Sequence, residues 1–234
     1  MAGKILHTML SGLTQTRVEH HGEIIVIGLG RFGSSLAHTL IEMGFEVLGV
    51  DADVQRVQDH ADALTHVVQA DSTSERALRQ IGAADAVTVV VSIGTDIEAS
   101  VLTTAALVDL GVKNVWAKAI TEAHGRILQR VGAHHVVFPE ADMGTRIAHL
   151  LTGHMLEYLA LDDNFVIAEL IAPQELVGVP LGQSGVRAKY KVTVVCVKPV
   201  RGQFTYADHA TVLAESDLIV IAGHRADVER FTHT

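Results

Sequence analysis

The sequence contains few cysteine, proline or aromatic residues. Its 234 residues include one cysteine and four prolines, and aromatic residues make up 4%. One cysteine cannot form an internal disulfide, which is typical of proteins in a reducing compartment such as the cytoplasm. Cys196 lies in an apolar strand pattern, where a buried small hydrophobic residue is favoured over a reactive thiol.

Long hydrophobic runs are also absent. The longest are of the kind VTVVV and VTVVCV, whereas a helix needs about 18 apolar residues to cross a bilayer. Residues 1–22 lack the sustained apolar stretch of a secretory signal and show no clear periodicity, so we expect a flexible N-terminal arm. The expected protein is soluble and cytoplasmic.

Positive charge is scarce as well. The 18 lysines and arginines are outnumbered by 27 aspartates and glutamates, which gives a formal net charge of -9 at pH 7. Binding to nucleic acid or to an anionic lipid surface depends on an excess of Lys and Arg. The 14 histidines offset part of the charge only below about pH 6.5. No nucleic-acid partner is therefore expected.

From residue 23 onward, short β-branched runs alternate with amphipathic segments. Strands are predicted at 23–28, 46–51, 65–71, 86–92, 114–119 and 134–140. Helices are predicted between them at 31–43, 53–62, 74–81, 96–110 and 121–131. This alternation predicts an α/β fold, with a Rossmann-like doubly wound parallel sheet over residues 23–143.

The regular alternation of predicted strands and helices ends after Pro139. Residues 140–158 carry apolar positions at helical spacing and predict one long helix, so residues 144–160 are expected to form a crossover or hinge helix. Shorter strands are predicted at 165–172, 191–199, 203–207 and 217–223, with a last helix at 224–231. Residues 161–234 are thus expected to form a smaller C-terminal α+β lobe.

A glycine-rich turn joins the first predicted strand to the first predicted helix. Its glycines follow the spacing Gly-x-Gly-x-x-Gly. Gly28 allows a tight turn, Gly30 lets a phosphate approach the backbone, and Gly33 lets the helix pack on the strand. Asp51, at the end of the second strand, is expected to accept hydrogen bonds from ribose hydroxyls and to disfavour the 2′-phosphate of NADP. The alternative is that the glycines serve packing alone.

Arg31 lies between these glycines. Its planar fork of donors suits phosphate oxygens, and the side chain could reach a third phosphate or the ligand of a neighbouring subunit. Some dehydrogenases also carry arginine at this position, and a solvated loop cation is the simpler alternative.

The sequence contains no recognisable catalytic motif. A dehydrogenase needs a general acid or base and groups that fix its substrate, and neither lobe offers such a frame. The pairs His20-His21 and His134-His135 would point to opposite faces of a strand and make poor joint metal ligands. A small NAD-dependent oxidoreductase remains an alternative function, as does a stand-alone nucleotide-responsive regulator.

Several stretches together resemble one protein family. They are VIGLGRFGSSLAHTL, MGFEVLGVD, ADST, VSIGTDIEASVLTT, VWAKA, ILQRVGAHHVVFPEADMG, VRAKY and DLIVIAGHRADVERF, spread over about residues 23 to 233. In order and spacing they resemble the RCK (KTN) domain regulatory subunits of bacterial potassium uptake systems (KtrA/TrkA type). The resemblance implies a non-enzymatic protein that binds ATP, ADP, NAD or NADH. It also implies homodimers that assemble into a homo-octameric ring, peripheral to the inner face of the membrane against a potassium-translocating subunit (KtrB/TrkH type).

The resemblance also implies a set of nucleotide-binding residues. Arg31 matches an arginine that contacts the terminal phosphate of ATP across paired subunits. Glu140 matches an acidic residue linked to a cation at the same junction, where Mg²⁺, Ca²⁺ or Na⁺ would separate the carboxylate from the phosphates; the alternative is a first-turn carboxylate that interacts with the helix dipole. The full set is Gly28, Gly30, Arg31, Phe32, Gly33, Asp51, Ala52, Asp53, Asp71, Ser72, Ile93, Gly94, Thr95, Lys118, Ala119, Ile120, His124 and Glu140.

A second ligand is implied for the C-terminal lobe. Some relatives bind cyclic di-AMP there, and the stretch SGVRAKYKV resembles that segment. Arg187 would pair with a phosphate, while Val186 and Ala188 would face the adenine. The alternative is that Arg187 and Lys189 belong to a solvated turn.

Overall fold

The computed structural model describes residues 23–151 and 155–232. The expected N-terminal arm, residues 1–22, lies outside this range. The chain divides into two compact units, and the described residues fall into 23–140 and 141–232. The limits expected for the lobes remain a prediction, and each unit is considered by itself.

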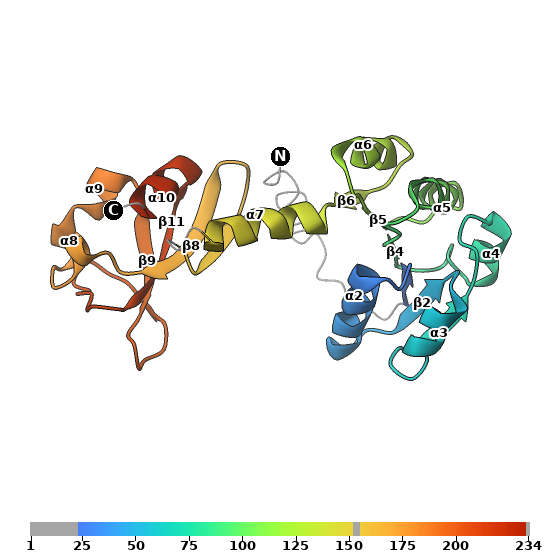
Figure 1. The fold of residues 1–234 in the computed structure, drawn as a ribbon, viewed down its shortest axis with the longest axis horizontal. Coiled ribbons are helices and arrows are strands. Elements are labelled where there is room, and N and C mark those ends of the chain that lie inside the picture. Colours follow the sequence, from blue (N-terminus) through green and yellow to red (C-terminus); the bar gives the residue numbers. More distant parts are fainter. Residues whose placement is uncertain (1–22, 152–154, 233–234) are drawn as a thin grey trace. The chain divides into compact units, whose positions relative to one another are not determined.

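The first unit is built on a six-stranded parallel sheet (Figure 1). The strand order is β3-β2-β1-β4-β5-β6, which confirms the Rossmann-like doubly wound fold. Buried valines and isoleucines fill the central strands because helices cover the sheet. The strands are β1 (Ile24–Ile27), β2 (Val47–Asp51), β3 (His66–Gln69), β4 (Thr88–Val91), β5 (Val115–Lys118) and β6 (His135–Val137).

Helices connect successive strands of this sheet, and four of them begin at a side-chain cap. Asp53, Ser74, Asp96 and Thr121 each accept a hydrogen bond from a backbone N–H in the following first turn. Among these helices, α4 contacts α5 and α5 contacts α6 (Figure 1). The helices are α2 (Arg31–Glu42), α3 (Val54–His60), α4 (Glu75–Gln80), α5 (Ile97–Asp109) and α6 (Glu122–Arg130). Each lies within the range predicted for it.

The second unit contains a five-stranded antiparallel sheet in the order β10-β9-β11-β8-β7. Its core gathers alternate residues of β8 and β11 with Val228 and Phe231 of the last helix. The strands are β7 (Glu157–Ala160), β8 (Phe165–Ile171), β9 (Thr193–Lys198), β10 (Thr205–Tyr206) and β11 (Leu218–His224). The helices are α8 (Leu181–Ser184), α9 (Val186–Tyr190) and α10 (Arg225–Thr232), with a 3₁₀ turn at Gln174–Leu176. This arrangement confirms the smaller α+β lobe.

The long helix predicted for 140–158, and the hinge helix assigned to 144–160, were wrong at their C-terminal end. The helix α7 spans Pro139–Leu151, and Glu157–Ala160 form β7 instead. Tyr158 is buried in the core of the second unit, and the strand pairs with β8 along its whole length. The short segment EYLA satisfies either periodicity, and pairing with β8 decides for the strand.

Candidate functional site

A cavity of about 770 Å³ opens at the carboxyl ends of the first unit's strands. Residues that follow β1, β2, β3, β4 and β5 line it, together with Glu140 at the start of α7. Ligands of doubly wound sheets bind outside the carboxyl ends of the strands, where the strand order reverses. The volume lies within the range of about 300–1,000 Å³ that small-molecule sites occupy.

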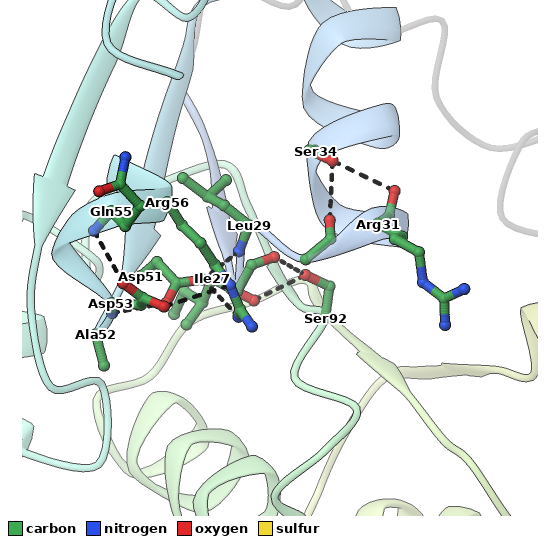
Figure 2. A network of polar contacts seen from close by, with 12 residues as sticks. Ile27, Leu29, Arg31, Ser34, Asp51, Ala52, Asp53, Gln55, Arg56 and Ser92 are labelled. Carbon is green, nitrogen blue, oxygen red and sulfur yellow. Dashed lines mark hydrogen bonds and ion pairs between the residues drawn. The ribbon is translucent and has the colours of Figure 1, made fainter. Parts of the chain in front are cut away.

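The glycine turn is held in one conformation. Gly28 has a φ of +94°, a region that favours glycine. A Cβ atom at Gly33 would fall on the carbonyl oxygen of Gly28 and on Ser92 Oγ, far inside van der Waals contact. Ser92 Oγ donates toward the carbonyl oxygens of Ile27, at 2.9 Å, and Gly28 (Figure 2). At Gly30, by contrast, a Cβ would meet nothing within 4 Å, so this residue leaves the cavity open to a ligand.

Asp51 links the glycine turn to the end of β2 through hydrogen bonds. Its Oδ2 accepts a hydrogen bond from the backbone N–H of Leu29 at 2.7 Å, and its Oδ1 accepts one from Asp53 N–H at 2.9 Å (Figure 2). The Asp51 residue is 7% exposed. The carboxylate predicted to bind ribose thus already holds two backbone segments in place.

Arg31 begins α2 and its side chain is exposed. Figure 2 shows the guanidinium extending away from the network around Asp51. The neighbouring Ser34 hydroxyl donates to the carbonyl oxygen of Gly30 at 2.9 Å, which ties the first turn of α2 to the glycine turn. The N-terminus of α2 therefore presents backbone N–H groups and an exposed cation, an arrangement suited to phosphate.

Lys118 and Glu140 form an ion pair in the cavity wall. Lys118 Nζ lies 2.5 Å from Glu140 Oε1 and 5.6 Å from the centroid of the Phe32 ring. A Cβ at Gly94 would lie 3.1 Å from this ammonium, so glycine gives the lysine its room. The hydrogen bond from Lys118 holds the pKa of Glu140 below its usual value, and the charge of Arg31 acts in the same direction.

Asp71 and Ser72 lie after β3. Asp71 Oδ1 accepts from both the N–H and the hydroxyl of Thr73, and these bonds lower the pKa of Asp71. Ser72 is buried, and its hydroxyl lies 2.9 Å from that of Thr103. Within the ADST stretch, Asp71, Ser72 and Thr73 thus form a hydrogen-bonded turn in the cavity lining.

Most residues of the predicted set line this cavity. They are Gly28, Gly30, Arg31, Phe32, Asp51, Ala52, Asp53, Asp71, Ser72, Ile93, Gly94, Thr95, Lys118, Ile120 and Glu140. Three residues of the set are absent from the lining. Gly33 packs against the glycine turn, Ala119 is buried in the core, and His124 is 2% exposed.

His124 was predicted to lie near the ligand; its side chain is buried and does not line the cavity, and its role stays a prediction. It lies in the first turn of α6, where its backbone N–H binds the Thr121 cap and its Nδ1 accepts from Ile120 N–H at 3.4 Å. Burial lowers its pKa. The prediction from the sequence also missed ten lining residues. On helices these are Ser34, Arg56, Asp59, His60 and Ala99, and on strand ends and loops they are Ile27, Leu29, Thr73, Ser92 and Asp96. Arg56 is signalled only by its position soon after Asp51.

Glu140 is the one predicted metal ligand. Within residues 23–151 and 155–232, no group of three or more His, Cys, Asp or Glu side chains is arranged to hold a metal ion.

No helix of the described chain combines the length and apolar character needed to span a membrane.

A second cavity, of about 400 Å³, lies in the C-terminal unit. The short helix α9 contributes Val186, Arg187 and Ala188 to its lining, and Asp208 and His209 lie in its wall. Val186 is buried, whereas Arg187 and Ala188 are exposed. The residues predicted for a second ligand therefore share one cavity, and the turn considered as an alternative is a helix.

The two units match two family models in sequence. Residues 24–139 match the TrkA-N domain, and residues 165–234 match the TrkA-C domain. The chain thus belongs to the class of proteins that join a TrkA-N domain, here the Rossmann-like unit with its cavity, to a TrkA-C domain.

Characterised relatives cover nearly the whole chain. It is 37% identical over 210 residues to the Ktr system potassium uptake protein C of Bacillus subtilis (strain 168), which covers 89% of this chain and 95% of that protein. It is 38% identical, with the same coverage, to protein A of that system and organism. The Vibrio alginolyticus Ktr system potassium uptake protein A is 33% identical over 86% of this chain and 92% of its own length. The chain therefore belongs to the family of Ktr potassium uptake proteins.

Solved structures agree on the fold. The RCK domain of GsuK superposes with a TM-score of 0.61 at 22% identity, over 93% of this chain and 48% of that one. The GsuK channel bound to NAD gives a TM-score of 0.60 at 21% identity, over 96% and 43%. Family membership decides against the alternative of a small NAD-dependent oxidoreductase, because the relatives that match most of the chain are potassium uptake proteins.

Proposed function

We propose that this chain is a cytoplasmic nucleotide-binding subunit that gates a membrane potassium-translocating subunit (KtrB/TrkH type). One observation carries the proposal. A single cavity joins the glycine turn, the Asp51 carboxylate and the Lys118–Glu140 pair, in a chain whose relatives are potassium uptake proteins. The subunit would be peripheral to the inner face of the membrane through its partner.

The ligand we propose is ATP or ADP, with NAD or NADH as alternatives of the same shape. Its phosphates would lie at the N-terminus of α2 beside Gly30, where free N–H groups and the helix dipole favour an anion. Its ribose would lie toward Asp51, whose Oδ1 keeps an acceptor site after binding Asp53 N–H. Arg31 is exposed at this helix N-terminus and would reach a third phosphate.

Gating requires that the ligand bind two shapes of the assembly with different affinity. We propose that homodimers assemble into a homo-octameric ring and that Arg31 reaches the terminal phosphate of ATP in a paired subunit. Glu140 would then lie close to phosphates of like charge. A divalent cation or Na⁺ between them would remove that repulsion, with Glu140 as its protein ligand.

The C-terminal cavity is proposed as a second ligand site. Arg187 is exposed on α9, and the buried Val186 and the exposed Ala188 lie beside it in the same lining. A guanidinium beside an apolar wall suits a phosphate joined to a base, so cyclic di-AMP is the ligand we propose there.

Potassium flux tests the function. The chain and its membrane partner are reconstituted into liposomes, and potassium uptake is followed with ATP, with ADP and without nucleotide. We expect flux to differ between ATP and ADP, and the difference to shrink for Arg31→Ala. Equal flux in all three conditions, with the complex intact by co-purification, would overturn the proposal.

A further inference from the structure

Arg56 lines the nucleotide cavity without belonging to any motif of the sequence. It is the third residue of α3, and its guanidinium spans two carboxylates (Figure 2). Its Nη1 lies 3.4 Å from Asp51 Oδ2, and its Nε lies 3.8 Å from Asp53 Oδ2. Strong charge-assisted bonds measure about 2.7–2.9 Å. Since its side chain is also 47% exposed, Arg56 is held loosely and can exchange partners.

Helix stability explains an arginine at this position only weakly, because its i,i+3 ion pair with Asp53 spans 3.8 Å between half-exposed side chains. A cation in the first turn opposes the helix dipole. The N-terminus of α3 is already capped by Asp53, which accepts from Gln55 N–H at 2.9 Å. No residue of α3 is buried, so Arg56 does not cover a core. What the position does provide is access to the cavity.

The hydrogen bonds of Asp51 show what Arg56 controls. Asp51 Oδ2 accepts from Leu29 N–H and from Arg56, which fills its two lone pairs. A ribose hydroxyl can therefore use this oxygen only after the guanidinium moves away. Arg56 thus competes with the sugar for Oδ2, while Oδ1 keeps one acceptor site, so a ribose that binds both oxygens needs the guanidinium displaced.

The negative charge of the cavity lining around Asp51 indicates where the Arg56 guanidinium would move. The end of β2 and the segments that follow β2 and β3 contribute four carboxylates to the lining, those of Asp51, Asp53, Asp59 and Asp71, and these disfavour any further phosphate. A neutral planar base meets no such penalty. Guanidinium groups stack on flat π surfaces, and a purine offers a larger face than a pyrimidine.

We infer that Arg56 is a specificity-determining residue that leaves Asp51 to the ribose and stacks on the base, selecting purine over pyrimidine nucleotides. The inference rests on the proposed nucleotide-binding function. It adds the residue that recognises the nucleoside, whereas Arg31 and Lys118 lie near the phosphates.

Calorimetric titration of the full chain with ADP and with UDP tests it. The variants are Arg56→Ala, Arg56→Lys, which keeps the charge without the planar face, and Arg79→Ala as the matched control. Arg79 is an exposed arginine on α4 that pairs with Glu75 and lies outside the cavity lining.

We expect the wild type to bind ADP more tightly than UDP. Arg56→Ala should weaken ADP binding by about 5-fold or more and UDP binding by less, so that the preference for ADP narrows. Arg56→Lys should not restore it, and Arg79→Ala should match the wild type. An unchanged preference in Arg56→Ala, full restoration by lysine, or a wild type without preference would overturn the inference. A wild type that binds neither nucleotide would overturn the proposed function itself.

Discussion

Lys118 at the end of β5 and Glu140 in the first turn of α7 form an ion pair with unequal exposure. The lysine side chain is 9% exposed and the glutamate side chain 61%. A buried ammonium depends on its counter-charge, whereas an exposed carboxylate is solvated by water. The two partners therefore differ in what their loss does to the fold.

Removing the glutamate should cost more stability than removing the lysine. Glu140→Gln leaves the Lys118 ammonium without a counter-charge, and we expect a loss of about 1 kcal/mol in the free energy of unfolding. Lys118→Met leaves only a solvated carboxylate and should cost less. Urea denaturation at pH 7 measures both, and a larger loss for Lys118→Met would show that the pair is not held as described.

The same pair predicts a pH dependence. The hydrogen bond from Lys118 lowers the pKa of Glu140 from its usual value of 4.5. The folded state then binds fewer protons than the unfolded state, so this stabilisation is complete above about pH 4.5 and is lost as the pH falls through the lowered pKa. The stability gap between wild type and Glu140→Gln should be constant near neutral pH and close below pH 4.5. A gap that widens on acidification would contradict this.

His124 predicts a second pH effect, in a higher window. Burial lowers its pKa from the usual 6.5, so the folded protein keeps the ring neutral while the unfolded chain takes up a proton below that pH. Stability from this residue is therefore present above pH 6.5 and is lost as the pH falls toward the lowered pKa. Urea midpoints at pH 7.5 and 5.5 should fall more for the wild type than for His124→Gln. Equal falls would indicate that His124 is solvated.

Gly33 is expected to be intolerant of a side chain. A methyl group there would overlap the Gly28 carbonyl and Ser92, so Gly33→Ala should destabilise the first unit by about 3 kcal/mol. Gly144, in the interior of α7, is the matched control because a Cβ there meets nothing within 4 Å. Gly144→Ala should be neutral or slightly stabilising. Thermal unfolding compares them, and similar melting temperatures would contradict the packing assigned to Gly33.

Much of the fold was predictable because its signals are local. The runs from EIIVIG to HHVVFPE read as buried strands, and Gly28 and Asp51 mark the connections at their ends. The strand β7 was missed because four residues do not separate helical from strand periodicity. What fixes EYLA as a strand is pairing with Phe165–Ile171, a contact that is not local.

The candidate site was likewise predictable only in part. Most lining residues on the loops after the strands were predicted, since a motif or the family resemblance points to them. Arg56 and His60 were missed because they reach the cavity from a helix. The burial of His124, which is 2% exposed, was not predicted because it is set by the packing of α6. Such placements depend on how elements pack and carry no signature in the sequence.

The most direct measurement of the central claim is calorimetric binding of ADP and ATP to the wild type and to Gly30→Val. Gly30 has a φ of −69° and a ψ of −174°, which a valine can adopt, and its Cβ would meet no atom within 4 Å. We expect this variant to fold with a stability loss of at most about 1 kcal/mol. Its side chain would occupy the place of the phosphates, and nucleotide affinity should fall at least about 10-fold. A wild type that binds neither nucleotide, or a folded Gly30→Val that binds both as the wild type does, would contradict the account.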